Sequence, residues 1–199
     1  MDTKHPVLDV IHRRRAVRSF TTERVAEDTI RALLDAAVHA PTAMHLEPWA
    51  FAVVQDRATL KRYSDRAKQM VLAEAESHRD LLAAPGATPG GHLAFLRSPD
   101  FNIFSDASTL IVICGRPMGT YVVADCWLAA ENVMLAACAL GLGTCCIGFA
   151  MPVLNTPEVK EELGIPAAVT AIAPIIVGVP RGEAPQIARK PPEILRWVR

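Results

Sequence analysis

The feature that most restricts the fold is a run of 22 residues without a charge, from Val133 to Leu154. By length alone it could cross a membrane, which takes about 20 apolar residues. It is interrupted by four helix-breaking residues, Gly141, Gly143, Gly148 and Pro152. A spanning helix would have to satisfy the freed backbone groups internally. We therefore expect the end of a buried helix, a turn and a buried strand, and no membrane span.

Apolar patterns in the rest of the chain predict further helices and strands. Between residues 26 and 40, Ile30, Leu33 and Leu34 recur at helical spacing, and Pro41 ends the pattern. Asp56 is placed to cap a long helix, and Thr156 with Pro157 opens a short one. Helices are expected over residues 5–14, 26–40, 58 to the low eighties, 121–140 and from 157 to about 164. Strands are expected over residues 49–55, 109–115, 143–149 and 169–179, the last broken or bulged at Pro174.

These elements follow one another in irregular order. Such an order favours an α+β fold, with helices layered on a sheet, over a doubly wound α/β fold. The length of 199 residues fits a single domain over residues 1–199. The stretch 84–91, rich in proline and glycine, is interpreted as a loop. The proline-rich tail 180–199 carries apolar anchors at Ile194, Leu195 and Trp197 and is expected to lie across another surface.

Composition limits the class of partner. Hydrophobic residues make up 51% of the chain and charged residues 21%, which indicates apolar surface left over for a subunit interface. We expect a homodimer. The formal net charge is zero, whereas a nucleic-acid-binding domain is normally basic, so no nucleic-acid partner is expected.

Several kinds of site are excluded by missing motifs. "GLGTCC" lacks the third glycine of a dinucleotide fingerprint and follows a helix instead of a strand. The histidines lack metal-ligand spacing, apart from the weak pair His45 and Glu47, so no metal is expected. No nucleophile and base can be paired, and we assign no catalytic side chain. The five cysteines form no CxxC pair and are expected to be reduced thiols in a cytoplasmic protein.

The stretch "RRRAVRSF" concentrates positive charge. Four arginines fall between Arg13 and Arg18 with no acid among them. If they end a helix, Arg14 and Arg18 lie one turn apart and repel each other. A cluster of this kind in a neutral chain favours a small anionic ligand, because the planar guanidinium group pairs well with phosphate.

Together with two other stretches, this one resembles the FMN-dependent nitroreductase family. The other two are "APTAMHLEPWAF" at 40–51 and "ALGLGTCCIGF" at 139–149. They match, in order and spacing, the family's RRSxRxF-like, PSxxNxQPW and GLGTxxIG segments, and the likeness covers nearly the whole chain. The resemblance implies a central, mainly antiparallel sheet flanked by helices, an intertwined homodimer, and FMN with NADH or NADPH as electron donor.

The resemblance also implies roles for particular residues. Arg14 and Arg189 would hold the FMN phosphate, Arg15 and Ala16 would contact the phosphate or the ribityl chain, and Arg18 would lie near N1 and O2 of the ring. Arg13 is expected in solvent. The neighbouring subunit would pack Pro41, Thr42, Ala43 and His45 on the flavin. Cys146, Ile147 and Gly148 would pass one face of the ring, with a backbone N–H near N5. The region 84–105 would form a lid, and the tail 180–199 would cover the partner subunit.

Four residues depart from the family pattern and leave the substrate open. Ala16 stands for a serine, His45 for an asparagine, Glu47 for a glutamine and Cys146 for a common aromatic residue. The expected activity is ping-pong hydride transfer to electron-poor acceptors such as nitroaromatics or quinones. The alternatives are a flavin-binding protein without turnover, and a specialised member that oxidises or fragments one metabolite.

Overall fold

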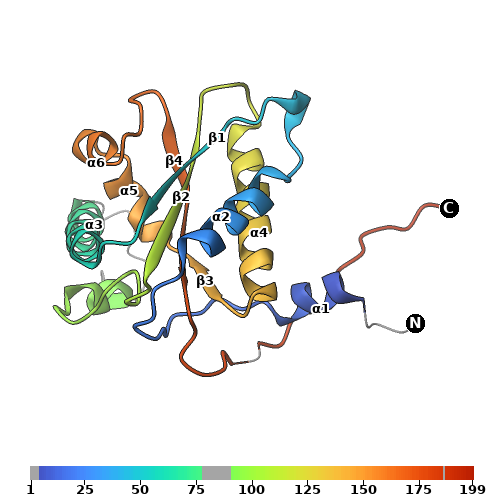
Figure 1. Cartoon of the computed structure of the whole chain (residues 1–199), viewed down its shortest axis with the longest axis horizontal. Helices are drawn as coiled ribbons and strands as arrows, with labels where there is room; N and C mark the ends of the chain where they lie inside the picture. The colour runs from blue at the N-terminus through green and yellow to red at the C-terminus, as the bar shows by residue number, and fades with distance from the viewer. Residues whose placement is uncertain (1–4, 78–90, 186) are drawn as a thin grey trace.

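An antiparallel sheet of four strands lies at the centre of the computed structural model, which describes residues 5–77, 91–185 and 187–199 (Figure 1). The spatial order is β1-β2-β4-β3, and each neighbouring pair is antiparallel. The strands are β1 (Trp49–Val54), β2 (Thr109–Gly115), β3 (Gly143–Cys146) and β4 (Thr170–Gly178). The expected α+β fold is confirmed, and each predicted strand is present.

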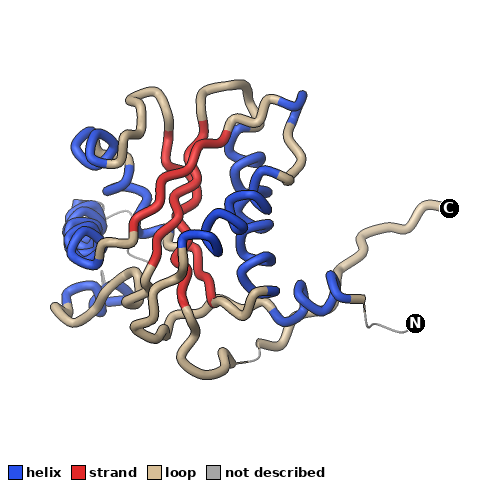
Figure 2. The backbone as a smooth tube through the Cα atoms, viewed as in Figure 1, coloured by secondary structure: helices blue, strands red, loops and turns tan. Residues whose placement is uncertain are grey.

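Helices cover both faces of this sheet (Figure 2). On one face lie α2 (Glu27–Val38) and α4 (Val122–Ala139), and on the other α3 (Arg57–Ser77), α5 (Met151–Leu154) and α6 (Pro157–Glu162). The first helix, α1 (Pro6–Arg13), lies beside the end of α4 and buries none of its own residues. Three short 3₁₀ helices complete the described elements: η1 (Ala43–His45), η2 (Gly91–Arg97) and η3 (Gly148–Ala150).

The core forms two layers because side chains of a strand alternate between the faces of the sheet. Every residue of β2 is buried. Leu110 and Val112 join the layer with α3, and Ile111 and Ile113 join the layer with α2 and α4. This explains why β2 reads as a continuous apolar run in the sequence.

Strand β3 is shorter than the predicted strand 143–149, and Pro174 of β4 explains why. Cys146 pairs with Ile175, so Ile147 lies opposite Pro174 and donates its N–H to the proline carbonyl at 2.9 Å. Proline has no N–H to return the second bond, so the ladder stops there. The chain then turns into η3 and α5.

The bulge in β4 lies two residues before the predicted position, Pro174. Pro174 pairs in register with Val112, whereas the register shifts where Ile113 faces Ala173 and Cys114 faces Ala171. The extra residue on β4 is therefore Ile172. Ile172 and Ala173 both face the layer with α4, as expected when a bulge interrupts the alternation.

The described helix boundaries agree with the predictions to within a few residues, and the predicted end of α3 in the low eighties lies outside the described residues. Asp56 caps α3 through a 2.7 Å bond from the Thr59 N–H, and hydrogen bonding to the side chain and then the backbone of Thr59 lowers the pKa of the aspartate. The predicted loop 84–91 lies outside the described residues except for Gly91, which begins η2.

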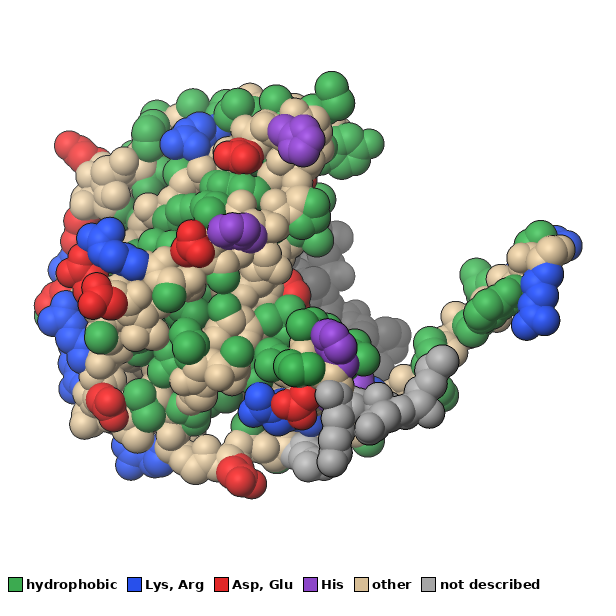
Figure 3. Space-filling model, turned by 45° about the vertical axis from the view of Figure 1, so that its right-hand side comes forward, with side chains coloured by type: hydrophobic (Ala, Val, Ile, Leu, Met, Phe, Trp, Pro, Cys, Tyr) green, Lys and Arg blue, Asp and Glu red, His purple; other side chains and the backbone are tan. Residues whose placement is uncertain are grey.

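One described helix, α4, is long and apolar enough to cross a membrane by length and composition alone. Only 33% of it is buried within the chain. The interrupted run 133–154 contains the predicted helix end and strand, in α4 and β3, followed by η3 and α5, which were not predicted. The outer side of α4 exposes Val123, Trp127 and Leu128. The tail extends away from the body (Figure 3) and exposes Leu195 and Trp197.

Candidate functional site

The arginine-rich segment is extended backbone and not the end of a helix. Helix α1 ends at Arg13, and Ala16 forms a parallel bridge to Thr144 of β3 while the Val17 N–H donates to the Thr144 carbonyl at 2.9 Å. In an extended segment alternate residues share a face. The side chains of Arg14, Ala16 and Arg18 therefore lie on one face because they are alternate residues of an extended segment. This corrects the expectation that Arg14 and Arg18 lie one helical turn apart.

Two glycines allow this segment to lie against the edge of the sheet. Gly143 of β3 pairs with Gly178 of β4. A Cβ added at Gly143 would lie 2.8 Å from Val17, and one added at Gly178 would lie 2.8 Å from the Phe20 ring. Val17 and Phe20 thus point into the body, and Ala16 and Arg18 are exposed. Phe20 lies three residues after Val17, so the alternation of faces ends before Phe20.

The guanidinium groups in this segment differ in their partners. Arg13 is exposed as predicted and pairs with Asp9 at 2.7 Å. Arg14 Nε lies 3.5 Å from Glu131 Oε1 of α4. Arg15 folds back so that Nη1 donates to the His12 and Arg14 carbonyls at 2.5 and 2.8 Å. Arg18 is exposed and has no hydrogen bond or ion pair with a described residue.

Arg15 also carries an unsatisfied donor. Its Nε is buried and has no hydrogen-bond partner among the described residues. A buried donor without a partner costs about 1–3 kcal/mol, so such a group in a native structure calls for an acceptor. This donor lies in the segment where an anion is expected.

The turn after β3 runs beside the arginine segment, since both meet at Thr144. Burial raises the pKa of the Cys146 thiol to about 11, and its Sγ lies 3.6 Å from Met134 Sδ. Burial likewise raises the pKa of the Cys145 thiol, against the opposing charges of Arg18 and Arg14. These thiols are protonated at neutral pH. A Cβ added at Gly148 would meet no atom within 4 Å, so this residue borders open space.

The segment Pro41–His45 lies apart from the arginines within the chain (Figure 1). The Ala43 N–H donates to Asp125 Oδ1 in the first turn of α4 at 3.2 Å, whereas Val10 of α1 accepts a bond from Cys138 in the last turn. Thirteen residues of helix separate those contacts, about 20 Å at a rise of 1.5 Å per residue. Arg14 contacts α4 nearer to Asp125, at Glu131. The described contacts bring Arg14–Arg18 together with Cys146–Gly148, and no hydrogen bond or ion pair among the described residues joins Pro41–His45 to either segment.

Backbone strain is concentrated after Ala43. Met44, His45 and Glu47 have φ values of 57, 53 and 46°, in the left-handed region that residues with a Cβ rarely occupy. Each such residue costs of order 1–3 kcal/mol and persists where its surroundings hold it. Asp125, which is only 4% exposed, provides one such contact. Sequence reasoning missed Asp125, although a lone aspartate in the apolar first half of this helix was a signal.

Arg189 is exposed in the extended tail and forms no hydrogen bond or ion pair with a described residue. Earlier tail residues do approach the arginine segment: Pro180, Gly182 and Ala184 line a cavity of about 350 Å³ together with Arg14 and Arg15. Among the described residues, no group of three or more His, Cys, Asp or Glu side chains is arranged to hold a metal ion.

Several known proteins resemble this chain. A model described as "Nitroreductase family" matches residues 11–179. A protein of Archaeoglobus fulgidus, provisionally named NADH dehydrogenase/NAD(P)H nitroreductase, is 29% identical over 181 residues, 88% of this chain and 86% of its own length. Nitrobenzene nitroreductase of Ectopseudomonas oleovorans is 25% identical over 205 residues, 89% of this chain and 88% of its own length.

A solved structure shares the fold across almost the whole length. It is a nitroreductase with bound FMN from Bacteroides fragilis, 25% identical, which superposes with a TM-score of 0.77. The match covers 98% of this chain and 99% of the other.

Proposed function

The chain belongs to the nitroreductase family, and we propose that it is an FMN-dependent NAD(P)H oxidoreductase that acts in the cytoplasm as a homodimer. Its acceptors would be flat, electron-poor molecules such as nitroaromatics or quinones. The observation that carries the proposal is the extended segment Arg14–Arg18, which presents alternate side chains outward beside the turn Cys146–Gly148. The names of the relatives, which include FMN and NAD(P)H, support it.

The residues present fit FMN. Arg15 Nε is a buried donor without an acceptor, Arg18 is an unpaired cation, and Gly148 borders open space. A phosphate would accept from guanidinium groups bidentately. Arg14, with Arg189 of the tail, would hold the phosphate, and Arg15 and Ala16 would contact the phosphate or the ribityl chain.

When bound, FMN supplies the redox chemistry, accepting a hydride at N5 from NADH or NADPH and passing it to the acceptor in a second half-reaction. Arg18 would stabilise negative charge near N1 and O2 of the ring, because its guanidinium stays protonated at every relevant pH. The Ile147 N–H is already bonded to Pro174, so an amide offered to the ring would come from the following residues of this turn. No side chain of this chain is assigned as a general acid.

The second half of the site would come from a partner subunit. Within one chain, Pro41, Thr42, Ala43 and His45 lie at the first turn of α4, whereas α1, which precedes the arginine segment, lies at its last turn. An apolar surface is available for the contact, formed by residues of α1, α4 and the tail: Val7, Leu8, Ile11, Val123, Trp127, Leu128, Leu195 and Trp197. Burying each large apolar side chain contributes about 1.5–3 kcal/mol, so this surface could hold two subunits together.

The cytoplasmic assignment rests on the cysteines. Five cysteines without a CxxC pair are typical of a protein kept in a reducing compartment.

An absorbance spectrum of the purified protein, followed by anaerobic titration with NADH and with NADPH, tests this function. We expect flavin absorbance, and rapid bleaching near 450 nm with at least one nicotinamide. A flavin that bleaches only slowly would favour a binding protein without turnover. Protein that stays colourless after FMN is added would refute the assignment.

A further inference from the structure

A second cavity, of about 840 Å³, opens on the other side of Arg18. It lies between the segment that follows Arg18, the first turns of α3 and the loop before β2. Its apolar floor is formed by Phe20, Leu60 and Ala107, all buried. The volume falls within the range of small-molecule sites, about 300–1,000 Å³. The cavity is therefore large enough for an organic molecule with an apolar body.

Unpaired positive charge gathers around this cavity. Arg18, Arg57 and Arg181 line it, and none of them forms an ion pair with a described residue. Arg57 Nη2 donates to the Thr22 carbonyl at 2.7 Å, and Arg181 Nε and Nη2 both donate to the Phe20 carbonyl at 3.2 Å. These bonds orient two guanidinium groups without neutralising their charge.

Some arginines on other described surfaces face carboxylates, and others, such as Arg24 and Arg116, do not. Arg31 pairs with Glu27, Arg62 with Glu162 and Arg66 with Glu158. The chain as a whole has no net charge. The cavity stands out because it gathers three guanidinium groups, none of which has an acidic partner among the described residues.

The remaining charged groups on its walls leave a positive balance. Lys61 lines the cavity and its Nζ lies 2.5 Å from Asp65 Oδ2. Two acids also line it, Asp100 and Asp106, and Asp106 accepts a bond from the Asn102 amide. The lining residues have a formal excess of two positive charges, and an excess of one remains when Asp65, the partner of Lys61, is included.

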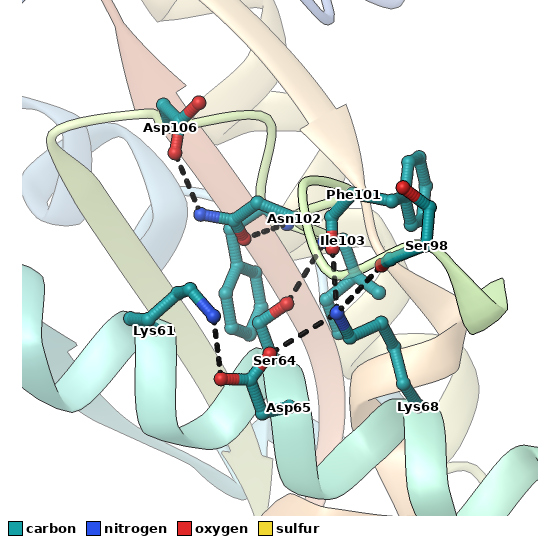
Figure 4. A network of polar contacts seen from close by, with 10 residues as sticks. Lys61, Ser64, Asp65, Lys68, Ser98, Phe101, Asn102, Ile103 and Asp106 are labelled. Atoms are coloured by element: carbon teal, nitrogen blue, oxygen red, sulfur yellow. Dashed lines mark hydrogen bonds and ion pairs between the residues drawn. The ribbon is translucent and has the colours of Figure 1, made fainter. Parts of the chain in front are cut away.

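The wall opposite α3 is held in place before any ligand binds. Buried Lys68 donates to the carbonyls of Ser98 and Phe101 at 3.3 and 2.8 Å, and it pairs with Asp65 at 3.1 Å (Figure 4). Ser64 accepts the Ile103 N–H at 3.0 Å. These contacts fasten residues 98–103, the last part of the region expected to form a lid, to the body of the protein.

The same wall ends in two strained residues. Ser105 and Asp106 have φ values of 53 and 56°, and both line the cavity. The Asn102 side chain supports them, since its amide donates to Asp106 and its carbonyl accepts the Phe104 N–H (Figure 4). Strain of this kind is typical of ligand-binding segments whose geometry is fixed in advance.

We propose that this cavity binds the oxyanion of an organic reactant, a carboxylate or a phosphate, between Arg18, Arg57 and Arg181, with the apolar body of the molecule on Phe20 and Leu60. The proposal rests on the proposed function, because Arg18 is also expected at the flavin ring. The cavity would then hold the charged end of a molecule whose other end reaches the flavin. Anionic substrates would be preferred over neutral ones of the same shape.

Three glutamine variants test this site. Arg57→Gln and Arg181→Gln each remove one charge and keep a side-chain donor for the backbone carbonyl, and Arg66→Gln is the matched control on another face of α3. Arg18 is left unchanged. Binding of 4-nitrobenzoate and of ADP is measured by calorimetry, and kcat/KM is compared for 4-nitrobenzoate and neutral 4-nitrobenzamide.

We expect each cavity variant to weaken the binding of one of the two anions by about tenfold, the usual loss for a charge-assisted hydrogen bond. The kcat/KM for 4-nitrobenzamide should change by no more than about twofold. A loss of affinity for 4-nitrobenzoate identifies a carboxylate ligand. A loss of affinity for ADP identifies a phosphate ligand such as the nucleotide donor. Equal affinity for both anions in all three variants would overturn the proposal. If the anion binds as expected but the protein takes up no FMN, the site stands and the proposed function fails.

Discussion

Replacing Asp125 by alanine should weaken FMN binding without unfolding the protein. The carboxylate is buried at the start of α4 and accepts the Ala43 N–H at 3.2 Å. It is a side-chain anchor for a segment with three left-handed residues in four positions, Met44 to Glu47. Without this anchor the segment would relax towards ordinary backbone angles, and the surface offered to the partner's flavin would lose its shape.

The size of the effect follows from the bond. A hydrogen bond to a charged group contributes about 1.5–3 kcal/mol, which corresponds to a change of about 10- to 150-fold in the fraction of chains with the segment in place. At 3.2 Å the bond is on the long side, so we expect the lower end, a rise of about tenfold in the FMN dissociation constant. Asp125→Asn retains Oδ1 as an acceptor and should recover most of the affinity.

Fluorescence titration of FMN measures the constant, and thermal unfolding of the apoprotein measures stability. Asn132→Ala is the matched control, because Asn132 also lies on α4 but donates to Ala36 of α2 and not to the segment. In the proposed dimer each site combines the arginine segment of one subunit with Pro41–His45 of the other, so a mixed dimer of Asp125→Ala with Arg14→Ala should contain one unaltered site. Unchanged FMN affinity in Asp125→Ala, or a loss matched by Asn132→Ala, would refute the reasoning.

Four further predictions concern the body of the protein. Gly143→Ala should push Val17 off the sheet edge, lower the midpoint of urea unfolding by an overpacking cost of about 1–3 kcal/mol, and weaken FMN binding. Lys68→Met should leave two backbone carbonyls without their hydrogen-bond donor and destabilise the protein by about 2–3 kcal/mol in the same assay. Wild-type stability would contradict the role given to this lysine. The raised pKa of Cys146, about 11, means that the folded chain keeps a proton that the unfolded chain releases near pH 9, so stability should fall as pH rises between those values. Trp127→Glu should shift the protein to monomers in sedimentation velocity, and a dimer that persists would exclude α4 from the interface.

The fold follows closely from the sequence because its signals are local. Leu33 and Ile30 mark the buried side of α2 by spacing alone, and the apolar run of β2 reflects burial on both faces. The end of β3 was not predictable in this way. It depends on Pro174, a residue 28 positions beyond Cys146 that faces the strand only after the sheet has formed.

The candidate site was harder to predict than the fold. Its arginines were identified, yet their geometry was not, because the edge contact with Thr144 replaces helical spacing by extended backbone. Arg57 and Arg181 carry no pattern in the sequence, since they meet Arg18 only through the packing of three distant segments. Asp125 likewise acquires its role through a contact 82 residues away in the chain.

The most direct test of the central claim is FMN titration of the wild-type protein and of Arg14→Ala and Arg18→Ala. We expect one FMN bound per chain in the wild type and weaker binding by about tenfold or more in each variant, since each loses a charge-assisted contact. Binding that is equally tight in all three proteins would show that the extended arginine segment is not the place where the flavin is held.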